Sequence, residues 1–183
     1  LVGIDRIAAM ARQLGLGEEY DLPMPSQRYG TVPDSAWKAR RSKGARPTHR
    51  NVVSNGMQCG ETMFFGEDDV YLHIAPMFHS ADLLGTGFTL IGGAHAYLAQ
   101  FAPRNFLQAI QDLKVTWTML APTMIIVTLQ DLTPADFDLK SWRAFIYGSA
   151  PMAPEWIAKS MAAVKGVEIV QGYGLTETSP ILT

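Results

Sequence analysis

The nine residues GYGLTETSP, Gly172 to Pro180, combine side chains that could bind a nucleotide. Glycines let the backbone approach a ligand closely, and hydroxyls and amides can bond phosphate oxygens. A tyrosine face can stack on a base, and a carboxylate can hold a magnesium ion. The stretch therefore suits a nucleoside triphosphate together with its metal ion.

The elements that must position this stretch follow from the pattern upstream of it. From about Val52 onward, short apolar runs alternate with longer segments of helical period. We expect strands within 70–77, 94–101, 115–122, 142–150 and 167–174. We expect helices within 83–93, 103–114, 123–132 and 153–166. Strands that are apolar on both faces and separated by helices predict an α/β fold, a mostly parallel sheet flanked by helices.

Ligands bind such sheets at the carboxyl ends of the strands. The segments that follow the expected strands are PMFHS, APT, GSAPM and GYGLTET. We therefore expect the strand ends at Met77, Pro122, Gly148 and Gly172 to converge on one rim, with the opening stretch among them.

Length and composition narrow the class of protein. A chain of 183 residues with 48% hydrophobic and 17% charged residues is one core-rich domain, some of whose surface lacks a partner. The net charge of −2 argues against a polyanion binder, and the single cysteine, Cys59, argues against an oxidising compartment. We therefore expect a cytoplasmic protein that binds no nucleic acid. No apolar run is long enough to span a bilayer, so we also expect no membrane span.

The N-terminal part, residues 1–51, reads as irregular apart from an amphipathic helix at its start. Its basic stretch from Lys38 to Arg50 supplies an alternative from a different class, a polyanion-binding module. Only Trp37 accompanies these charges, so the interleaved aromatics of a single-strand binder are missing.

The stretch QGYGLTETSP resembles the signature of the adenylate-forming enzymes, which include acyl-CoA synthetases, luciferases and peptide-synthetase adenylation domains. Further stretches resemble other motifs of that superfamily and follow in its order: THRNVV, APMFHSADLLG, APTM and YGSAPMAPE. The resemblance runs from about Lys43 to the last residue. It implies that residues 1–183 are a single partial AMP-binding domain, with a degenerate phosphate loop in 1–51 and an alternating strand and helix core in 52–183.

The resemblance also implies roles for individual residues. Tyr173 would stack on adenine, Thr176 would bond ATP phosphate oxygens and Glu177 would ligate magnesium. His79 would lie beside the reacting carboxylate. Backbone around the nucleotide and the acyl group would come from Gly148, Ser149, Ala150, Pro151, Gly172, Gly174 and Leu175.

The phosphate loop departs from the superfamily's pattern. SKGA, Ser42 to Ala45, keeps the Lys-Gly pair, but SAWKARR precedes it in place of a hydroxyl-rich cradle. Of the phosphate loop, only Lys43 and Gly44 are therefore expected to contact phosphate. The chain ends before the superfamily's ribose-binding aspartate and lid lysine, so we expect the isolated chain to be inactive.

The implied reaction has two steps, ATP-dependent adenylation of a carboxylic acid and transfer of the acyl group to coenzyme A, with Mg²⁺ assisting the first. A fatty or aryl acid is favoured over an amino acid, for whose ammonium group Asp82 is the nearest acidic candidate. Met77, Met124 and Met152 could line an acyl tunnel. The remaining alternative in this class is a catalytically inactive relative that binds nucleotide or carboxylate.

The other histidines, His49, His73 and His95, are expected to be structural or solvated, because no pair of them has metal-ligand spacing. Cys59 is expected to be a small buried apolar residue. Self-association through surfaces left uncovered by the partial domain is also expected.

Overall fold

The computed structural model describes residues 9, 47–77, 79–176 and 181–182. The chain divides into two compact units, 1–45 and 46–183, and all described residues except residue 9 lie in the second. Expectations for the starting helix, for Lys43 and Gly44, and for most of the basic stretch therefore fall outside the described residues.

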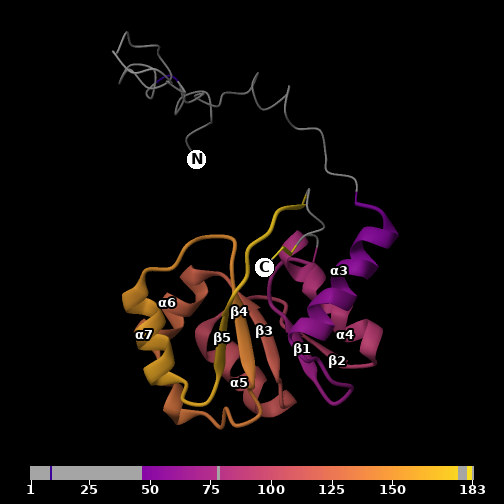
Figure 1. The fold of residues 1–183 in the computed structure, drawn as a ribbon. Coiled ribbons are helices and arrows are strands. Elements are labelled where there is room, and N and C mark those ends of the chain that lie inside the picture. Colours follow the sequence, from indigo (N-terminus) through magenta and orange to yellow (C-terminus); the bar gives the residue numbers. More distant parts are fainter. Residues whose placement is uncertain (1–8, 10–46, 78, 177–180, 183) are drawn as a thin grey trace. The chain divides into compact units, whose positions relative to one another are not determined.

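The second unit is built on a sheet of five strands, each four residues long (Figure 1). The strands are β1 (Val70–His73), β2 (Ala94–Tyr97), β3 (Trp117–Leu120), β4 (Ala144–Tyr147) and β5 (Glu168–Gln171). Their order is β2-β1-β3-β4-β5, and every neighbouring pair is parallel. The expected parallel α/β sheet is confirmed.

Helices cover both faces of this sheet. The α-helices are α3 (His49–Thr62), α4 (Gly85–Ile91), α5 (Pro103–Leu113), α6 (Pro122–Asp131) and α7 (Pro154–Ala163). Two short 3₁₀ helices, η1 (Ser80–Leu84) and η2 (Pro134–Asp136), complete the unit. Helices α3 and α4 pack together on one side of the sheet, and α5, α6 and α7 lie on the other (Figure 1).

Proline begins three of these helices, at Pro103, Pro122 and Pro154. A proline fits the first helical turn because its missing N–H has no intrahelical partner there and its φ is already helical. Pro122, expected as a strand end, instead opens α6, so β3 ends at Leu120.

Helix α3 begins at His49, so residues 49–51 are helical although the irregular part was expected to extend to residue 51. Thr48 caps the helix: its hydroxyl accepts from the Asn51 N–H, and the Asn51 side chain accepts from the Thr48 N–H. This reciprocal pair satisfies two backbone donors that would otherwise lack partners at the helix start.

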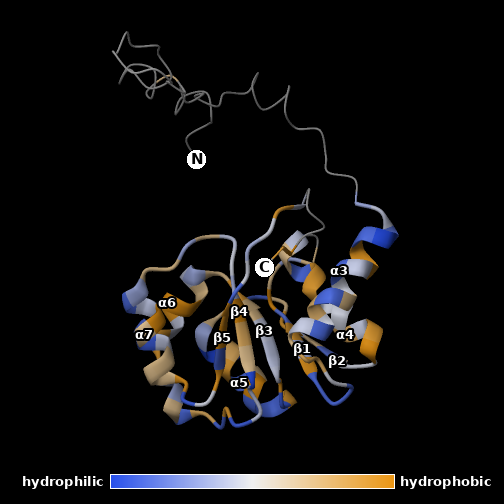
Figure 2. Cartoon of the chain, in the orientation of Figure 1, coloured by the Kyte–Doolittle hydropathy of each residue, from blue (hydrophilic) through white to orange (hydrophobic). Residues whose placement is uncertain are grey.

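The strands bury side chains on both faces, as the apolar runs predicted. Alternate residues such as Leu72, Leu120 and Phe145 face α5, α6 and α7. The residues between them, such as Tyr71 and Trp117, join the cluster under α3 and α4. Figure 2 shows hydrophobic colouring on β4 and on part of β1 at the centre of the unit.

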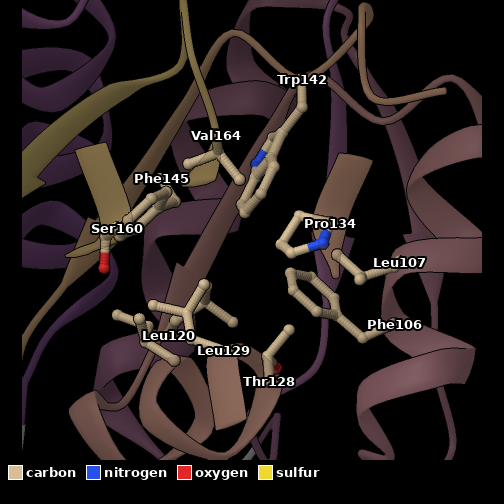
Figure 3. A pocket seen from close by; sticks show the side chains of 11 residues that line it. Phe106, Leu107, Leu120, Thr128, Leu129, Pro134, Trp142, Phe145, Ser160 and Val164 are labelled. Atoms are coloured by element: carbon tan, nitrogen blue, oxygen red, sulfur yellow. The ribbon is translucent and has the colours of Figure 1, made fainter. Parts of the chain in front are cut away.

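An apolar cavity lies within the first of these clusters, beneath α5, α6 and α7 (Figure 3). Aromatic and aliphatic side chains line it, among them Phe106, Trp142 and Phe145. The hydroxyls of Thr128 and Ser160 also reach its wall, but each donates to a carbonyl of its own helix, at 2.8 and 2.7 Å. The cavity therefore presents hydrocarbon and belongs to the packing of the core.

Among the residues that the structure describes, no helix has the length and apolar character needed to cross a membrane.

Candidate active site

The carboxyl ends of all five strands lie at one rim, because every strand pair is parallel. At β1 the direction of winding changes, since β2 is its neighbour on one side and β3 on the other. The connections on the two sides of such a switch point diverge over opposite faces and leave a crevice between them. A ligand site is therefore expected beyond the ends of β1 and β3.

A small pocket lies at that place. It is lined by segments that follow β1, β4 and β5, together with Met119 of β3 and Ile181: His79, Ser80, Ala81, Met119, Ser149, Gly172, Tyr173, Gly174 and Ile181. A wider hollow shares several of these residues and is lined by Ser149, Ala150, Pro151, Gln171, Gly172, Tyr173, Gly174 and Leu175. The expected convergence of the segments after β1, β4 and β5 on one rim is thus confirmed, although the strands end earlier than expected.

Two glycines allow the segments after β4 and β5 to approach each other. A Cβ on Gly148 would lie 2.7 Å from the Gly172 carbonyl oxygen, and a Cβ on Gly172 would lie 2.9 Å from Ile146 Cγ2. Real Cβ atoms do not come this close to backbone, so only glycine fits at Gly148 without moving the loops apart. The Gly172 N–H donates to the Tyr147 carbonyl at 2.8 Å and holds the pair together.

Ser149, the next residue, has a φ of +66°. A residue with a Cβ rarely adopts this left-handed conformation, and local strain of this kind concentrates at functional sites. The strain lies where the resemblance expects adenine and the acyl group.

His79 caps η1 at the end of the segment after β1. The ring nitrogen Nδ1 of His79 accepts a hydrogen bond from the Ala81 N–H at 3.1 Å, and the backbone N–H of His79 donates to the Pro76 carbonyl at 2.8 Å. With Nδ1 accepting, a neutral imidazole carries its proton on Nε2. The ring is exposed at the rim pocket, where it can present that donor to a ligand.

The segments after β1 and β5 are joined across 96 residues of sequence by a hydrogen bond from the Thr176 hydroxyl to Ser80 Oγ, at 2.9 Å. Thr176 therefore lies at the same rim as His79, as expected. Tyr173 is 59% exposed, so its ring is accessible to a planar ligand. Glu177, the expected magnesium ligand, lies outside the described residues.

Residues 173–174 pair with residues 181–182, because Gly174 and Ile181 form an antiparallel bridge and the Leu182 N–H donates to the Tyr173 carbonyl at 2.8 Å. Asn55 of α3 holds Ile181 in place: the side-chain amide donates to the Ile181 carbonyl at 2.7 Å and accepts from the Ile181 N–H at 3.3 Å. The sequence analysis did not identify Asn55. Asn55 is a buried amide within a helix, and nothing in the sequence singles it out until its hydrogen-bond partner, 126 residues away, is known.

Asp82 does not face the pocket, which corrects its assignment as a candidate partner for a substrate ammonium group. It is 5% exposed, and its carboxylate is engaged by His73 at 2.7 Å and by Tyr71 at 3.3 Å. His73 is buried and His95 partly buried, and the two rings contact each other at 2.8 Å, as expected for structural histidines; His49 is exposed. Cys59 is buried, as expected, and burial raises the pKa of its thiol.

Met77, Met124 and Met152, the candidates for an acyl tunnel, are not among the residues that line the two rim hollows; Met119 lines the smaller one instead.

The described residues fit a nucleotide better than they fit a metal ion alone. Exposed Tyr173, the close-packed glycine backbone and the hydroxyls of Ser80 and Thr176 match a base and phosphates in kind. Within the described ranges, no cluster of three or more His, Cys, Asp or Glu side chains could hold a metal.

The model of the AMP-binding enzyme family matches residues 41–183. The chain belongs to this family. The resemblance read from QGYGLTETSP and the stretches upstream of it is confirmed.

Relatives of this AMP-binding chain include a probable 4-coumarate–CoA ligase 1 of Dictyostelium discoideum, 31% identical over 90% of the chain and 31% of the relative. Among solved structures, the inhibitor-bound N-terminal domain of FACL13 from Mycobacterium tuberculosis has a TM-score of 0.69 at 30% identity, over 75% of the chain and 34% of that protein. ATP-bound MatB from Rhodopseudomonas palustris has a TM-score of 0.67 at 31% identity, over 76% and 28%. The chain thus spans about a third of the length of the curated relatives it matches.

Proposed function

We propose that the protein containing this chain is an AMP-forming acid–CoA ligase. A carboxylate oxygen attacks the α-phosphorus of ATP and expels pyrophosphate, and the thiol of coenzyme A then attacks the acyl carbon of the adenylate and releases AMP. The observation that carries the proposal is the convergence of His79, Ser149 and Gly172–Thr176 at one rim of the sheet. Relatives named as CoA ligases support the same chemistry.

The residues of this chain act mainly by positioning. Tyr173 offers an exposed ring for the adenine, and the paired glycine segments let the nucleotide lie against backbone. Thr176 bonds phosphate oxygens, so its present bond to Ser80 is exchanged when ATP binds. His79 orients the acid through Nε2, because Nδ1 is held by the backbone of η1.

Glu177 is proposed as the magnesium ligand, together with phosphate oxygens. Magnesium, when bound, offsets the negative charge that otherwise repels an incoming carboxylate. Lys43 and Gly44 are proposed to contact phosphate as the remnant of the phosphate loop. All three roles rest on the family resemblance.

A fatty or aryl acid is the proposed substrate class. An amino acid would need a carboxylate for its ammonium group, and Asp82, the nearest candidate, is committed to His73. Aryl acids are supported by the relatives named as 4-coumarate–CoA ligases. Fatty acids remain in the class because the small residues around His79 and Ser149 leave room for either kind of chain.

ATP–pyrophosphate exchange by the full-length protein tests the proposal against a panel of fatty, aryl and amino acids. Exchange with fatty or aryl acids and not with amino acids is expected. Exchange confined to amino acids would overturn the substrate class. Binding of ATP without exchange for any acid would identify an inactive relative instead.

The variant Glu177→Gln tests the metal role in the same assay. Removing one transition-state charge contact typically costs about 10²- to 10³-fold in rate. We expect a loss of that size with an unchanged unfolding midpoint, because the carboxylate serves the metal and not the core. Unchanged exchange would remove Glu177 from the site.

The isolated 183-residue chain is proposed to bind ATP with magnesium weakly and to form no acyl-adenylate. It spans about a third of its relatives' length, and the resemblance places the ribose carboxylate and the lid lysine outside it. Robust turnover by the isolated chain would contradict this.

A further inference from the structure

Asn55 connects α3 to the backbone of Ile181. Its side-chain amide donates to the Ile181 carbonyl at 2.7 Å, and its side-chain oxygen accepts from the Ile181 N–H at 3.3 Å. A carboxamide offers a donor and an acceptor side by side, as a peptide group does, so one side chain can pair with both polar groups of a backbone residue. Ile181 is thereby held as a neighbouring strand would hold it, although Asn55 lies in a helix.

Helix α3 is a firm support for this contact. Gly56, which follows Asn55, packs so closely on α4 that an added Cβ would lie 3.1 Å from Thr86 Cγ2 and 3.2 Å from the Gly87 nitrogen. Cys59, one turn further along, is buried in the cluster beneath α3 and α4. Asn55 itself is only 9% exposed. Its amide therefore projects from a packed element rather than from an exposed loop.

The hydrogen bonds of Asn55 supply what apolar packing cannot. The Ile181 side chain packs against the same cluster beneath α3 and α4. Apolar contact has no direction, so it draws Ile181 toward α3 without selecting which backbone groups face the helix. Side chains alternate along an extended backbone, so a shift of one residue would turn Ile181 away from the cluster. The two bonds to Asn55 are directional, and they select Ile181 as the residue that faces α3.

This register is passed on to the rim pocket. Ile181 forms the antiparallel bridge with Gly174, and the Leu182 N–H donates to the Tyr173 carbonyl at 2.8 Å. Tyr173, Gly174 and Ile181 all line the smaller rim pocket. Fixing Ile181 therefore fixes the backbone of Tyr173 and Gly174 at the candidate site.

The segment after β5 is also tied at Gly172 and at Thr176. The Gly172 N–H donates to the Tyr147 carbonyl at 2.8 Å, and the Thr176 hydroxyl donates to Ser80 Oγ at 2.9 Å. Under the proposed function the Thr176 hydroxyl turns to phosphate when ATP binds, so its bond to Ser80 is given up. The contact with Asn55 involves no group assigned to a ligand, so it can hold the segment both before and after ATP binds.

We propose that Asn55 is a positioning residue for the nucleotide. By fixing the register of residues 181–182 against Tyr173 and Gly174, it holds in place the ring and the backbone on which the adenine lies. The nucleotide half of this inference rests on the proposed function, whereas the pairing of the two segments does not. Asn55 acts through these segments, so its loss is expected to weaken ATP binding without removing any group that contacts a substrate.

Three variants separate positioning from stability. Asn55→Leu keeps the branched shape of the side chain and removes both hydrogen bonds. Asn55→Asp keeps the acceptor for the Ile181 N–H and loses only the donor, and it serves in both measurements if Asn55→Leu does not fold. Thr118→Val is the matched control, because it also removes a buried hydrogen bond without changing shape, that from Trp142 Nε1 at 3.2 Å. Thr118 is fully buried and lines neither rim hollow.

Hydrogen exchange of the Leu182 amide in the full-length protein tests the pairing. NMR with leucine labelled by ¹⁵N follows this amide, and Leu182→Met assigns it. In Asn55→Leu the amide should exchange at least about tenfold faster than in the wild type, because the pairing opens locally, and Asn55→Asp should lie between the two. Thr118→Val should leave the rate unchanged. An unchanged rate in the Asn55 variants would overturn the inference, whether or not the protein adenylates any acid.

Calorimetry of ATP binding to the same proteins tests the positioning. Asn55→Leu and Thr118→Val are both expected to lower the unfolding midpoint, but only Asn55→Leu should raise the Kd for ATP, about 10- to 100-fold. An equal Kd in these two variants would overturn the positioning role, even if the Leu182 amide exchanged faster in Asn55→Leu. A wild type that bound no ATP would overturn that role together with the proposed function, and the Leu182 amide would still decide the pairing.

Discussion

Gly148 is the position of the candidate site at which the geometry most clearly requires one residue type, glycine. Its absent Cβ would lie 2.7 Å from the Gly172 carbonyl oxygen, and that atom is backbone, so it cannot rotate away. The motif around it was recognised in the sequence, but the closeness of the two segments was not predictable, because it depends on the register of β4 against β5. For single residues, the sequence therefore predicts which residue types form the site, whereas the distances between them are known only from the fold.

The variant Gly148→Ala is therefore expected to force the segments after β4 and β5 apart. We expect ATP binding by the full-length protein, measured by calorimetry, to weaken by at least about tenfold, with a loss of stability of about 1–3 kcal/mol. Gly60→Ala is the matched control, because the nearest atom to its new Cβ would be Phe65 Cδ2 at an ordinary 3.7 Å. Equal affinity in the two variants would show that the close approach does not matter for the nucleotide.

The elements were predictable where periodicity and proline marked them. The alternation of apolar runs with helical segments gave the order of β1 to β5 and of α4 to α7. Helix α3 was missed because its packing is invisible in sequence: Gly56 and Gly87 let it approach α4, and a Cβ on Gly87 would lie 3.0 Å from the Gly56 carbonyl. The residues of α3 are mostly polar or small and form no sustained apolar stripe, so the helix depends on its contact with α4 and on its N-terminal cap.

The cap of α3 makes a prediction about that element. Thr48→Ala removes the hydroxyl that accepts from the Asn51 N–H, at 3.2 Å. Loss of such a cap costs about 1 kcal/mol, so chemical denaturation should show a decrease in unfolding free energy of that size. Thr48→Ser keeps the acceptor and is expected to restore most of it. If Ser and Ala variants were equally unstable, the hydroxyl would not be the stabilising group.

The unit as a whole can be probed through Cys59, the single cysteine of the chain. It is buried in the cluster beneath α3 and α4, and burial raises the pKa of its thiol, so little thiolate is present at neutral pH. An alkylating reagent should therefore modify the native chain far more slowly than the same chain in guanidinium. Raising the pH should accelerate the native reaction. Labelling of the native chain at the unfolded rate would contradict the packing of α3 on the sheet.

At the scale of the whole molecule, the described residues include sheet edges and exposed apolar side chains, which fit the low charged fraction of the sequence. Among the described strands, β2 and β5 are the edges of the sheet, and unpaired edges invite pairing with another chain. Met57 and Leu90 add exposed apolar surface beside a hollow between α3 and α4. The low charged fraction predicted exposed apolar surface, but it could not predict where that surface lies, because the edge strands are known only once the strand order is known.

Self-association of the isolated chain is the expected consequence. The net charge of −2 supplies little repulsion between copies. Sedimentation velocity should show species larger than a monomer whose share grows with concentration. Met57→Lys and Leu90→Lys together should reduce that share if the α3 and α4 face is responsible, whereas Gln171→Lys, at an exposed position of the edge strand β5, should do so if the sheet edge is. A chain that stays monomeric at high concentration would show that neither surface is adhesive, and that the low charged fraction has another cause.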